Sequence, residues 1–183
     1  MKFIFDFDDV LFNTTDELIK HIYAVLKKEG VPHNSAKKYL EREVLNRFSL
    51  KKMLVYFSVS PKLYERILKE SKKFVNKELL KIIKKLGKVN CYIITYGDEE
   101  FQLDKIKRTN TNSLFSEIIV VSVDEKKELI EKICAKHKNE KVVFIDDKPK
   151  HFVDLDFKKC PNLKTILFDE RGLEKFISIL PQS

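Results

Sequence analysis

A short apolar run near the start of the chain ends abruptly in three carboxylates. The apolar residues 3–5 are followed by Asp6, Asp8 and Asp9. Clustered like charges repel one another and gain nothing from burial, so these side chains need a cation or a chemical role. Because side chains alternate along an extended strand, Asp6 and Asp8 are expected on one side and Phe7 on the other. Since open α/β sheets bind ligands beyond the carboxyl ends of their strands, this stretch predicts a functional site there.

The composition is typical of one α/β domain with a modest insertion. A chain of 183 residues with 43% hydrophobic residues can bury a sizeable core. No apolar run approaches the roughly 20 residues of a membrane span, and the chain opens on a strand pattern without the features of a signal peptide. We therefore expect a soluble, cytoplasmic protein without a membrane partner, and the oligomeric state stays unknown.

Charge and cysteine content point to no special partner. The net charge is +8, but the lysines occur as pairs along nearly every predicted helix instead of in one block. This distribution is typical of solvated helix faces, so a nucleic-acid partner is possible but not favoured, although a positive field would attract a phosphorylated substrate. Cys91, Cys134 and Cys160 lack metal-ligand spacing and are expected to be reduced thiols, with Cys91 buried in a strand.

Residues 13–77 are predicted to form successive helices without a convincing strand. The segment 14–17 has the spacing of a capping box, and apolar residues recur behind it at helical intervals. We interpret residues 13–77 as an inserted all-helical domain. Its helices are predicted at 16–28, through Leu40 and Val44, at 50–57, and from Pro61 to near Phe74.

The remaining residues, 1–12 and 78–183, alternate short apolar runs with helices. This alternation predicts right-handed crossovers and a parallel sheet that is covered on both faces. The expected fold class is therefore α/β, a Rossmann-like three-layer core domain with a five-stranded parallel sheet. After the first strand, strands are predicted at 89–95, 118–123, 142–145 and 163–168, and helices at 79–86, 99–108, 125–137 and 173–179.

Pairs of carboxylates end two of the predicted strands. Asp6 and Asp8 end the first, and Asp146 and Asp147 end the fourth. Because the carboxyl ends of parallel strands lie on one edge of a sheet, these four side chains are expected to meet. Two carboxylate pairs at the ends of buried strands predict a shared metal site. Hard oxygen ligands favour Mg²⁺ as the cofactor.

A hydroxyl and a lysine pair are predicted at the same edge of the sheet. Thr95, closely followed by Gly97, ends the second strand, and Lys126 with Lys127 begins the helix after the third. A threonine hydroxyl and loop N–H groups are suited to phosphoryl oxygens in a transition state. A lysine nearby would neutralise negative charge on a phosphorylated carboxylate. These residue types therefore favour phosphoryl transfer.

In this order, the four motifs resemble those of the haloacid dehalogenase-like hydrolase superfamily, whose members are mostly Mg²⁺-dependent phosphatases. The matching segments are Asp-Phe-Asp-Asp-Val-Leu, Ile-Ile-Thr-Tyr-Gly, a lysine, and Phe-Ile-Asp-Asp. The insertion 13–77 has no matching motif, but it lies where the superfamily carries a helical cap that closes over the pocket. Closure would exclude water and test the leaving group, so the insertion is expected to select the substrate.

The chemistry and the resemblance together give roles to the carboxylates. Asp6 is expected to attack phosphorus and to form an aspartyl phosphate. The resemblance implies that Asp8 is the general acid and base, which protonates the leaving oxygen and then deprotonates water. It also implies that the metal ligands are Asp6, the backbone carbonyl of Asp8, and either Asp146 or Asp147.

The resemblance also implies roles for the threonine of the second motif and the lysine of the third. Thr95 is expected to bind phosphate, and Lys126 is the implied lysine, with Lys127 as the alternative. Asp9 stands where many members have glycine, and Val10 where threonine is frequent. Both variants are compatible with activity because the backbone and the two key carboxylates remain, and Asp9 is expected to be a turn residue only.

Other polar residues are weaker candidates on sequence alone. Asp154 and Asp156 follow the fourth motif and could orient the metal ligands, although loop carboxylates are more often solvated. The four histidines are scattered, and none has a partner at the spacing of a metal site or a nucleophilic dyad. No function is therefore predicted for them.

Three functions are compatible with these residues. The first is a Mg²⁺-dependent phosphomonoester hydrolase that acts on a small cytosolic phosphorylated metabolite. The second, suggested by the basic charge, is a phosphatase for nucleotides or nucleic-acid ends. The third is a non-catalytic phosphate-binding regulatory protein, which we rank last because Asp6, Asp8 and both carboxylates of the fourth motif are present. Dehalogenase chemistry also occurs in the superfamily and would not need the metal.

Overall fold

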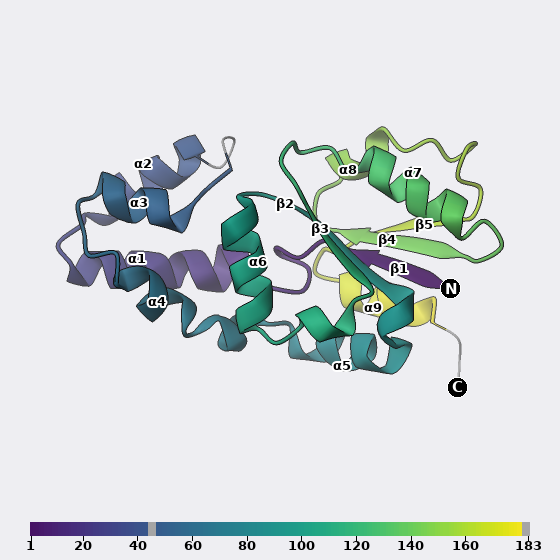
Figure 1. Ribbon diagram of the computed structural model, residues 1–183, viewed down its shortest axis with the longest axis horizontal. Helices are drawn as coiled ribbons and strands as arrows, with labels where there is room; N and C mark the ends of the chain where they lie inside the picture. The colour runs from purple at the N-terminus through teal and green to yellow at the C-terminus, as the bar shows by residue number, and fades with distance from the viewer. Residues whose placement is uncertain (44–46, 181–183) are drawn as a thin grey trace.

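A five-stranded parallel sheet forms the centre of the protein, whose computed structural model describes residues 1–43 and 47–180 (Figure 1). The strand order is β3-β2-β1-β4-β5, and every neighbouring pair is parallel. The predicted α/β fold with five parallel strands is thus confirmed. The strands are β1 (Lys2–Phe5), β2 (Cys91–Tyr96), β3 (Glu117–Val121), β4 (Val142–Asp146) and β5 (Leu163–Leu167).

The first strand lies in the middle of the sheet, where both of its faces are covered. Its register pairs Phe5 with Ile93 of β2 and with Ile145 of β4. Strands that are covered on both faces are apolar throughout, and β2 and β4 are buried along nearly their full lengths. The central place of β1 therefore brings Asp6 between the carboxyl ends of β2 and β4.

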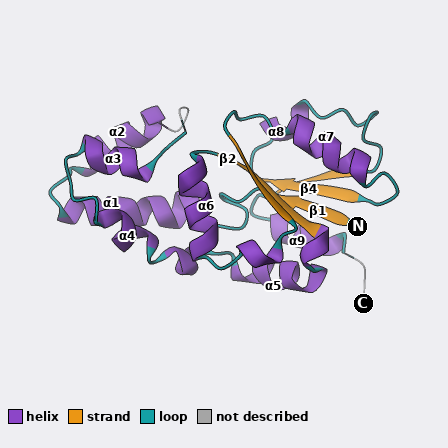
Figure 2. Cartoon of the chain, viewed as in Figure 1, coloured by secondary structure: helices purple, strands orange, loops and turns teal. Residues whose placement is uncertain are grey.

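Helices cover both faces of the sheet (Figure 2). On one face, Phe3 and Phe5 belong to a core cluster that includes Phe176 of α9 and residues of α5 and α6. On the other face, Ile4 clusters with Ile130 of α7. This is the predicted three-layer arrangement. The helices of these layers are α5 (Lys77–Leu86), α6 (Glu99–Arg108), α7 (Lys127–Lys136), α8 (Lys150–Val153) and α9 (Gly172–Ser178).

The described residues between β1 and α5 form a group of helices beside the sheet (Figure 1). The predicted single helix from Pro61 to Phe74 is wrong, because Ser71 donates its hydroxyl to the carbonyl of Leu68 at 2.7 Å and the chain continues as a 3₁₀ turn. Val44, predicted in a helix, lies outside the described residues. The α-helices here are α1 (Ile19–Lys28), which follows a π-helical turn, α2 (His33–Glu43), α3 (Leu50–Tyr56) and α4 (Leu63–Leu68).

The two segments that join these helices to the sheet run side by side. The N–H of Asn13 donates to the carbonyl of Phe74 at 2.8 Å, and that of Asn76 donates to the carbonyl of Leu11 at 2.9 Å. The side chain of Asn76 also accepts from the N–H of Leu79, which caps the start of α5. The paired segments make a narrow connection between the inserted helices and the sheet, while the domain boundaries at 12 and 78 stay a prediction.

Helix α6 lies between the sheet and the inserted helices, and ion pairs cross this border (Figure 1). Arg108 of α6 binds both carboxylate oxygens of Glu65 of α4, at 2.8 and 2.9 Å. Lys51 of α3 binds Glu100 of α6 at 2.5 Å. These residues line a pocket of about 390 Å³ that also includes Asp104. The pocket lies on the face of α6 that is opposite to its buried residues.

Two details correct or extend the element predictions. The strand predicted from residue 89 begins at Cys91, because Gly87 has a φ of 82° and the residues Lys88–Asn90 form a 3₁₀ turn. Cys91 is buried as predicted, and Cys134 and Cys160 are also buried free thiols. No helix within residues 1–43 and 47–180 is long and apolar enough to cross a membrane.

Candidate active site

A buried lysine joins the carboxylates that end β1 and β4. Asp6 is 3% exposed, Asp146 is 0% exposed and Lys126 is 2% exposed. The Nζ atom of Lys126 lies 3.0 Å from Oδ1 of Asp6 and 2.7 Å from Oδ2 of Asp146. Lys127, the alternative, is the first residue of α7 and is exposed. The structure therefore brings Lys126, and not Lys127, into contact with the two carboxylates.

Asp147 completes a group of three carboxylates. Asp6, Asp146 and Asp147 each offer one oxygen, and these oxygens lie within 4.8 Å of one another. The Oδ1 atom of Asp147 is buried and has no hydrogen-bond partner in the described part of the chain. Burial, together with the charges of Asp6 and Asp146, raises the pKa of Asp147 to about 7, even though Lys148 opposes the shift. Lys148 therefore compensates this carboxylate only in part, and its Oδ1 atom is free to bind a ligand.

The other two carboxylates differ in how they are compensated. Burial raises the pKa of Asp6, and the charges of Asp146 and Asp8 act in the same direction against Lys126. Burial also acts to raise the pKa of Asp146, but the hydrogen bond with His151 and the charge of Lys126 outweigh it, so this pKa is lowered. The negative charge of Asp146 is thus offset by its neighbours more fully than that of Asp6.

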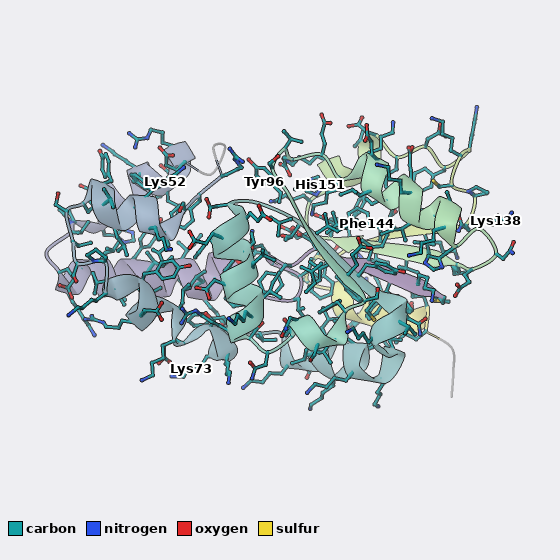
Figure 3. All side chains as sticks on the ribbon, in the orientation of Figure 1. Lys52, Lys73, Tyr96, Lys138, Phe144 and His151 are labelled. Carbon is teal, nitrogen blue, oxygen red and sulfur yellow. The ribbon has the colours of Figure 1, made fainter. Side chains whose placement is uncertain are left out.

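His151 was not predicted, and it links this group to the loop after β3. Its Nδ1 lies 2.8 Å from Oδ2 of Asp146, and its Nε2 lies 2.9 Å from Oδ1 of Asp124. In Figure 3, His151 on α8 is labelled near the end of the sheet that faces the inserted helices, whereas Lys138, which precedes β4, is labelled at the far end. The usable sequence signal was its place in the first helical turn after Asp146 and Asp147, since such a turn folds back over the strand end.

The carboxylate of Asp8 accepts hydrogen bonds from three side chains that the sequence did not predict as its partners. Its Oδ2 accepts a hydrogen bond from Nε2 of Gln102 at 2.6 Å, and its Oδ1 accepts from Lys105 and from the hydroxyl of Thr14. Burial acts to raise the pKa of Asp8, but Lys105, Gln102 and Thr14 outweigh it and lower the pKa. The predicted capping box is wrong because Thr14 binds Asp8, and the first turn has no side-chain cap.

Thr95 lies at the end of β2, the strand next to β1. It is 1% exposed, and its hydroxyl oxygen has no hydrogen-bond partner among residues 1–43 and 47–180. A buried hydroxyl without a partner is costly unless a ligand satisfies it. The position and the free hydroxyl are compatible with the predicted contact to phosphate.

The remaining carboxylates have local roles. Asp9 has a φ of 56°, and its side chain accepts from the N–H and the hydroxyl of Thr15 at 2.8 and 2.6 Å. Its predicted place in a turn is therefore confirmed. Asp156 accepts from the N–H groups of Lys158 and Lys159, so it closes a turn, and Asp154 is exposed. Neither shows a contact with the carboxylate group among the described residues.

Comparison with known proteins gives matches in fold and in family. A structure of a putative haloacid dehalogenase-like hydrolase from Burkholderia xenovorans is 19% identical over 94% of this chain and 89% of that chain, with a TM-score of 0.66. A putative hydrolase of the same superfamily from Bacillus subtilis, solved bound to magnesium, is 16% identical over 99% and 98%, with a TM-score of 0.59. A dehalogenase solved with an intermediate is 11% identical over 100% and 97%, with a TM-score of 0.57.

These structural matches are too distant in sequence to show more than the fold. No curated protein matches the chain in sequence. The model of the haloacid dehalogenase-like hydrolase family, however, matches residues 3–155, which include all four motifs. The chain therefore belongs to the haloacid dehalogenase-like hydrolase family.

Proposed function

We propose that the protein is a Mg²⁺-dependent phosphatase that cleaves phosphate monoesters through an aspartyl phosphate. The observation that carries the proposal is the group Asp6, Asp146 and Asp147, whose oxygens lie within 4.8 Å of one another. Lys126 forms the only lysine ion pairs with this group in the described chain. The charges of Lys126 and Lys148 act on these three carboxylates, which still leaves an excess of negative charge that a divalent cation would offset.

The donor set is suited to Mg²⁺, and the contacts indicate which residues would hold it. Asp146 already accepts from Lys126 and His151 on Oδ2 and from the N–H of Lys148 on Oδ1. Asp147 keeps a buried Oδ1 without a partner in the described residues. We therefore assign Asp6, Asp147 and the backbone carbonyl of Asp8 as direct ligands, and Asp146 as the residue that holds Lys126 in place.

In this proposal, Asp6 is the nucleophile. Its Oδ1 accepts from the N–H of Phe7 at 2.8 Å and contacts Lys126, so Oδ2 is the oxygen left to attack phosphorus. Bound Mg²⁺ would reduce the repulsion between this carboxylate and the phosphate. Lys126 neutralises charge on the phosphorylated Asp6, and the hydroxyl of Thr95 donates to a phosphoryl oxygen.

Asp8 handles the protons in both steps. In the first step, the bond from phosphorus to the leaving oxygen breaks as the bond to Asp6 forms, and Asp8 gives its proton to the leaving oxygen. In the second step, water attacks phosphorus, the bond to Asp6 breaks, and Asp8 takes a proton from the water. Asp8 therefore ends the cycle with the same number of protons as at the start, and the products are an alcohol and inorganic phosphate.

The inserted helices would act as the cap that selects the substrate. The narrow connection at Asn13 and Asn76 supports a part that can move relative to the sheet. The ion pairs across the border are largely exposed, so solvent screening weakens the hold that they provide. The substrate class proposed for this site is a small phosphorylated metabolite of the cytosol, because the carboxylates that would act on it are buried at the strand ends.

The test is the release of phosphate from a panel of small phosphate monoesters, with Mg²⁺ and with a chelator. Wild-type protein is expected to turn over at least one ester only when Mg²⁺ is present. Asp6→Asn is expected to lose nearly all activity because the amide cannot form the covalent intermediate. The exposed Asp154→Asn is the matched control and should keep wild-type activity. Turnover undiminished in Asp6→Asn would refute the mechanism.

The same experiment separates the alternatives. Release of halide from haloacids in the presence of chelator would indicate a dehalogenase instead. Cleavage of nucleic-acid ends that falls steeply with salt would favour the second predicted function, because binding to a polyanion releases counterions. Phosphate binding without turnover by folded protein would favour the regulatory one.

A further inference from the structure

Lys105 is a buried lysine that the proposed mechanism does not use. It is 1% exposed and lies on the inner face of α6, one helical turn after Gln102. Among residues 1–43 and 47–180, Asp8 is the carboxylate with which it forms an ion pair. Because a buried ammonium is costly without a partner, this pair fixes both side chains relative to each other.

The surroundings of Lys105 exclude water from its ammonium group, while the side chain of Asp8 stays 21% exposed. Its Nζ atom lies 4.9 Å from the ring centre of Phe101, 5.4 Å from that of Phe12 and 5.6 Å from that of Phe7. The aromatic side chains attract the cation and lower the local dielectric, which strengthens its interaction with Asp8. A mobile surface lysine would have no such enclosure.

The side-chain amide of Gln102, like the ammonium of Lys105, is held in one position by its contacts. Its Nε2 donates to Oδ2 of Asp8 at 2.6 Å and to the carbonyl of Tyr96 at 2.8 Å. Gly97 makes room for this amide, because a Cβ atom at that position would lie 2.6 Å from Nε2 of Gln102. Gly97 of the second motif therefore serves the contact between α6 and Asp8.

We infer that Gln102 and Lys105 are positioning residues for Asp8, which orient its carboxyl group for proton transfer to the leaving oxygen. This inference rests on the proposed phosphatase function. Oδ1 of Asp8 accepts from both Lys105 and Thr14, whereas Oδ2 accepts from Gln102. Oδ2 therefore keeps a lone pair that can carry the transferred proton. Because proton transfer requires close alignment, loss of this orientation slows the steps in which Asp8 acts.

The test compares Lys105→Met with Lys107→Met, the same change two positions along on the exposed face of α6. Each variant is assayed on p-nitrophenyl phosphate, whose leaving group needs little protonation, and on an alkyl phosphate that wild-type protein hydrolyses. Lys105→Met is expected to lower kcat about 10²-fold on the alkyl ester but about 10-fold or less on the aryl ester, with KM nearly unchanged. Lys107→Met should stay close to wild type on both.

Equal losses on the two esters, or no loss, would overturn the positioning role. Gln102→Ala gives a second route if Lys105→Met folds poorly, because it removes hydrogen bonds from an uncharged donor and leaves the ion pair. It is expected to show the same preference for the aryl ester, with a smaller loss on the alkyl ester. Loss of the preference in this variant would also count against the inference.

Thermal unfolding tests the pair without any turnover. Lys105→Met, Asp8→Asn and the double variant are compared with wild type. Each single change removes the charge that its partner faces, so the double variant is expected to lose less in Tm than the sum of the two singles. Additive losses would overturn the role of Lys105. An inactive wild-type protein that still shows this coupling would instead overturn the proposed function.

Discussion

The protein buries two lysines beside carboxylates of the proposed active site, and they differ in how many carboxylates they compensate. Lys126 at the start of α7 contacts both Asp6 and Asp146, and Asp147 lies within reach of the same group. Lys105 on α6 forms an ion pair with Asp8. The first group keeps excess negative charge, whereas the second is balanced. The metal is therefore expected at the strand ends near Lys126 and not beside α6.

Lys126→Met is the variant that should separate the two groups most strongly. Loss of a buried ammonium between two carboxylates should cost about 3–5 kcal/mol of metal-free stability and lower kcat roughly 10²–10³-fold. Saturating Mg²⁺ should then stabilise this variant more than wild type, because a more negative group binds the cation more tightly. Thermal unfolding with and without Mg²⁺ measures the difference.

Lys105→Met is the matched control for this comparison. It should also lose stability, but Mg²⁺ should stabilise it as much as wild type, because Lys105 pairs with the side chain of Asp8, whereas Asp8 is proposed to hold the cation through its backbone carbonyl. If Mg²⁺ raised the stability of Lys126→Met and of Lys105→Met by the same amount, the distinction between the two groups would be contradicted.

Asp147→Asn tests the partly compensated carboxylate through pH. Because the pKa of Asp147 is raised to about 7, the folded protein binds its proton more tightly than the unfolded chain does. Ionisation therefore removes stability as the pH rises from about 4 to about 7, by at most about 4 kcal/mol for this partly exposed side chain. Without metal, Asp147→Asn should be more stable than wild type near pH 8, and this advantage should shrink toward pH 4.

Urea unfolding in chelator at about pH 5 and about pH 8 measures this change. Asp154→Asn, an exposed carboxylate outside the group, should follow wild type at both values. An Asp147→Asn protein whose stability differs from wild type by the same amount at both pH values would show that Asp147 carries no raised pKa.

The strand ends of the sheet could be predicted from the sequence because their signals are local. Apolar runs that end in Asp6 and in Asp146 with Asp147 indicate both the strands and the place where they meet. The helix start indicated the pair Lys126 and Lys127, and the family resemblance suggested Lys126, with Lys127 as the alternative. The family resemblance gave these residues roles that the apolar pattern alone does not carry.

The contacts on α6 and α8 could not be predicted because they depend on how distant helices pack. Gln102 and Lys105 lie in the buried stripe of α6, where polar residues are unusual, but nothing local identifies Asp8 as their partner. His151 likewise has one partner at the end of β4 and another in the loop after β3. Thr14 matched a local capping pattern, yet its hydroxyl donates to the partly buried carboxylate of Asp8 instead.

The exposed ion pair between Arg108 and Glu65 should show the smallest effect. Their side chains are 25% and 68% exposed, so solvent screens the charges. Arg108→Gln is expected to cost less than about 1 kcal/mol, and the loss should shrink further at high salt. Mg²⁺ should raise the stability of this variant as much as it raises that of wild type. Thermal unfolding at low and high salt checks this, and a loss as large as that of Lys105→Met would mean that the border is not a weakly held contact.

The most direct test of the metal-dependent mechanism is a crystal structure with Mg²⁺ and beryllofluoride, which mimics a phosphoryl group on a carboxylate. The account predicts the mimic on Oδ2 of Asp6 and an octahedral cation held by Asp6, Asp147 and the carbonyl of Asp8, with ligand distances of about 2.0–2.1 Å. The cation should contact the mimic as well. A cation bound away from Asp6 and Asp147, or a mimic attached to another side chain, would contradict it.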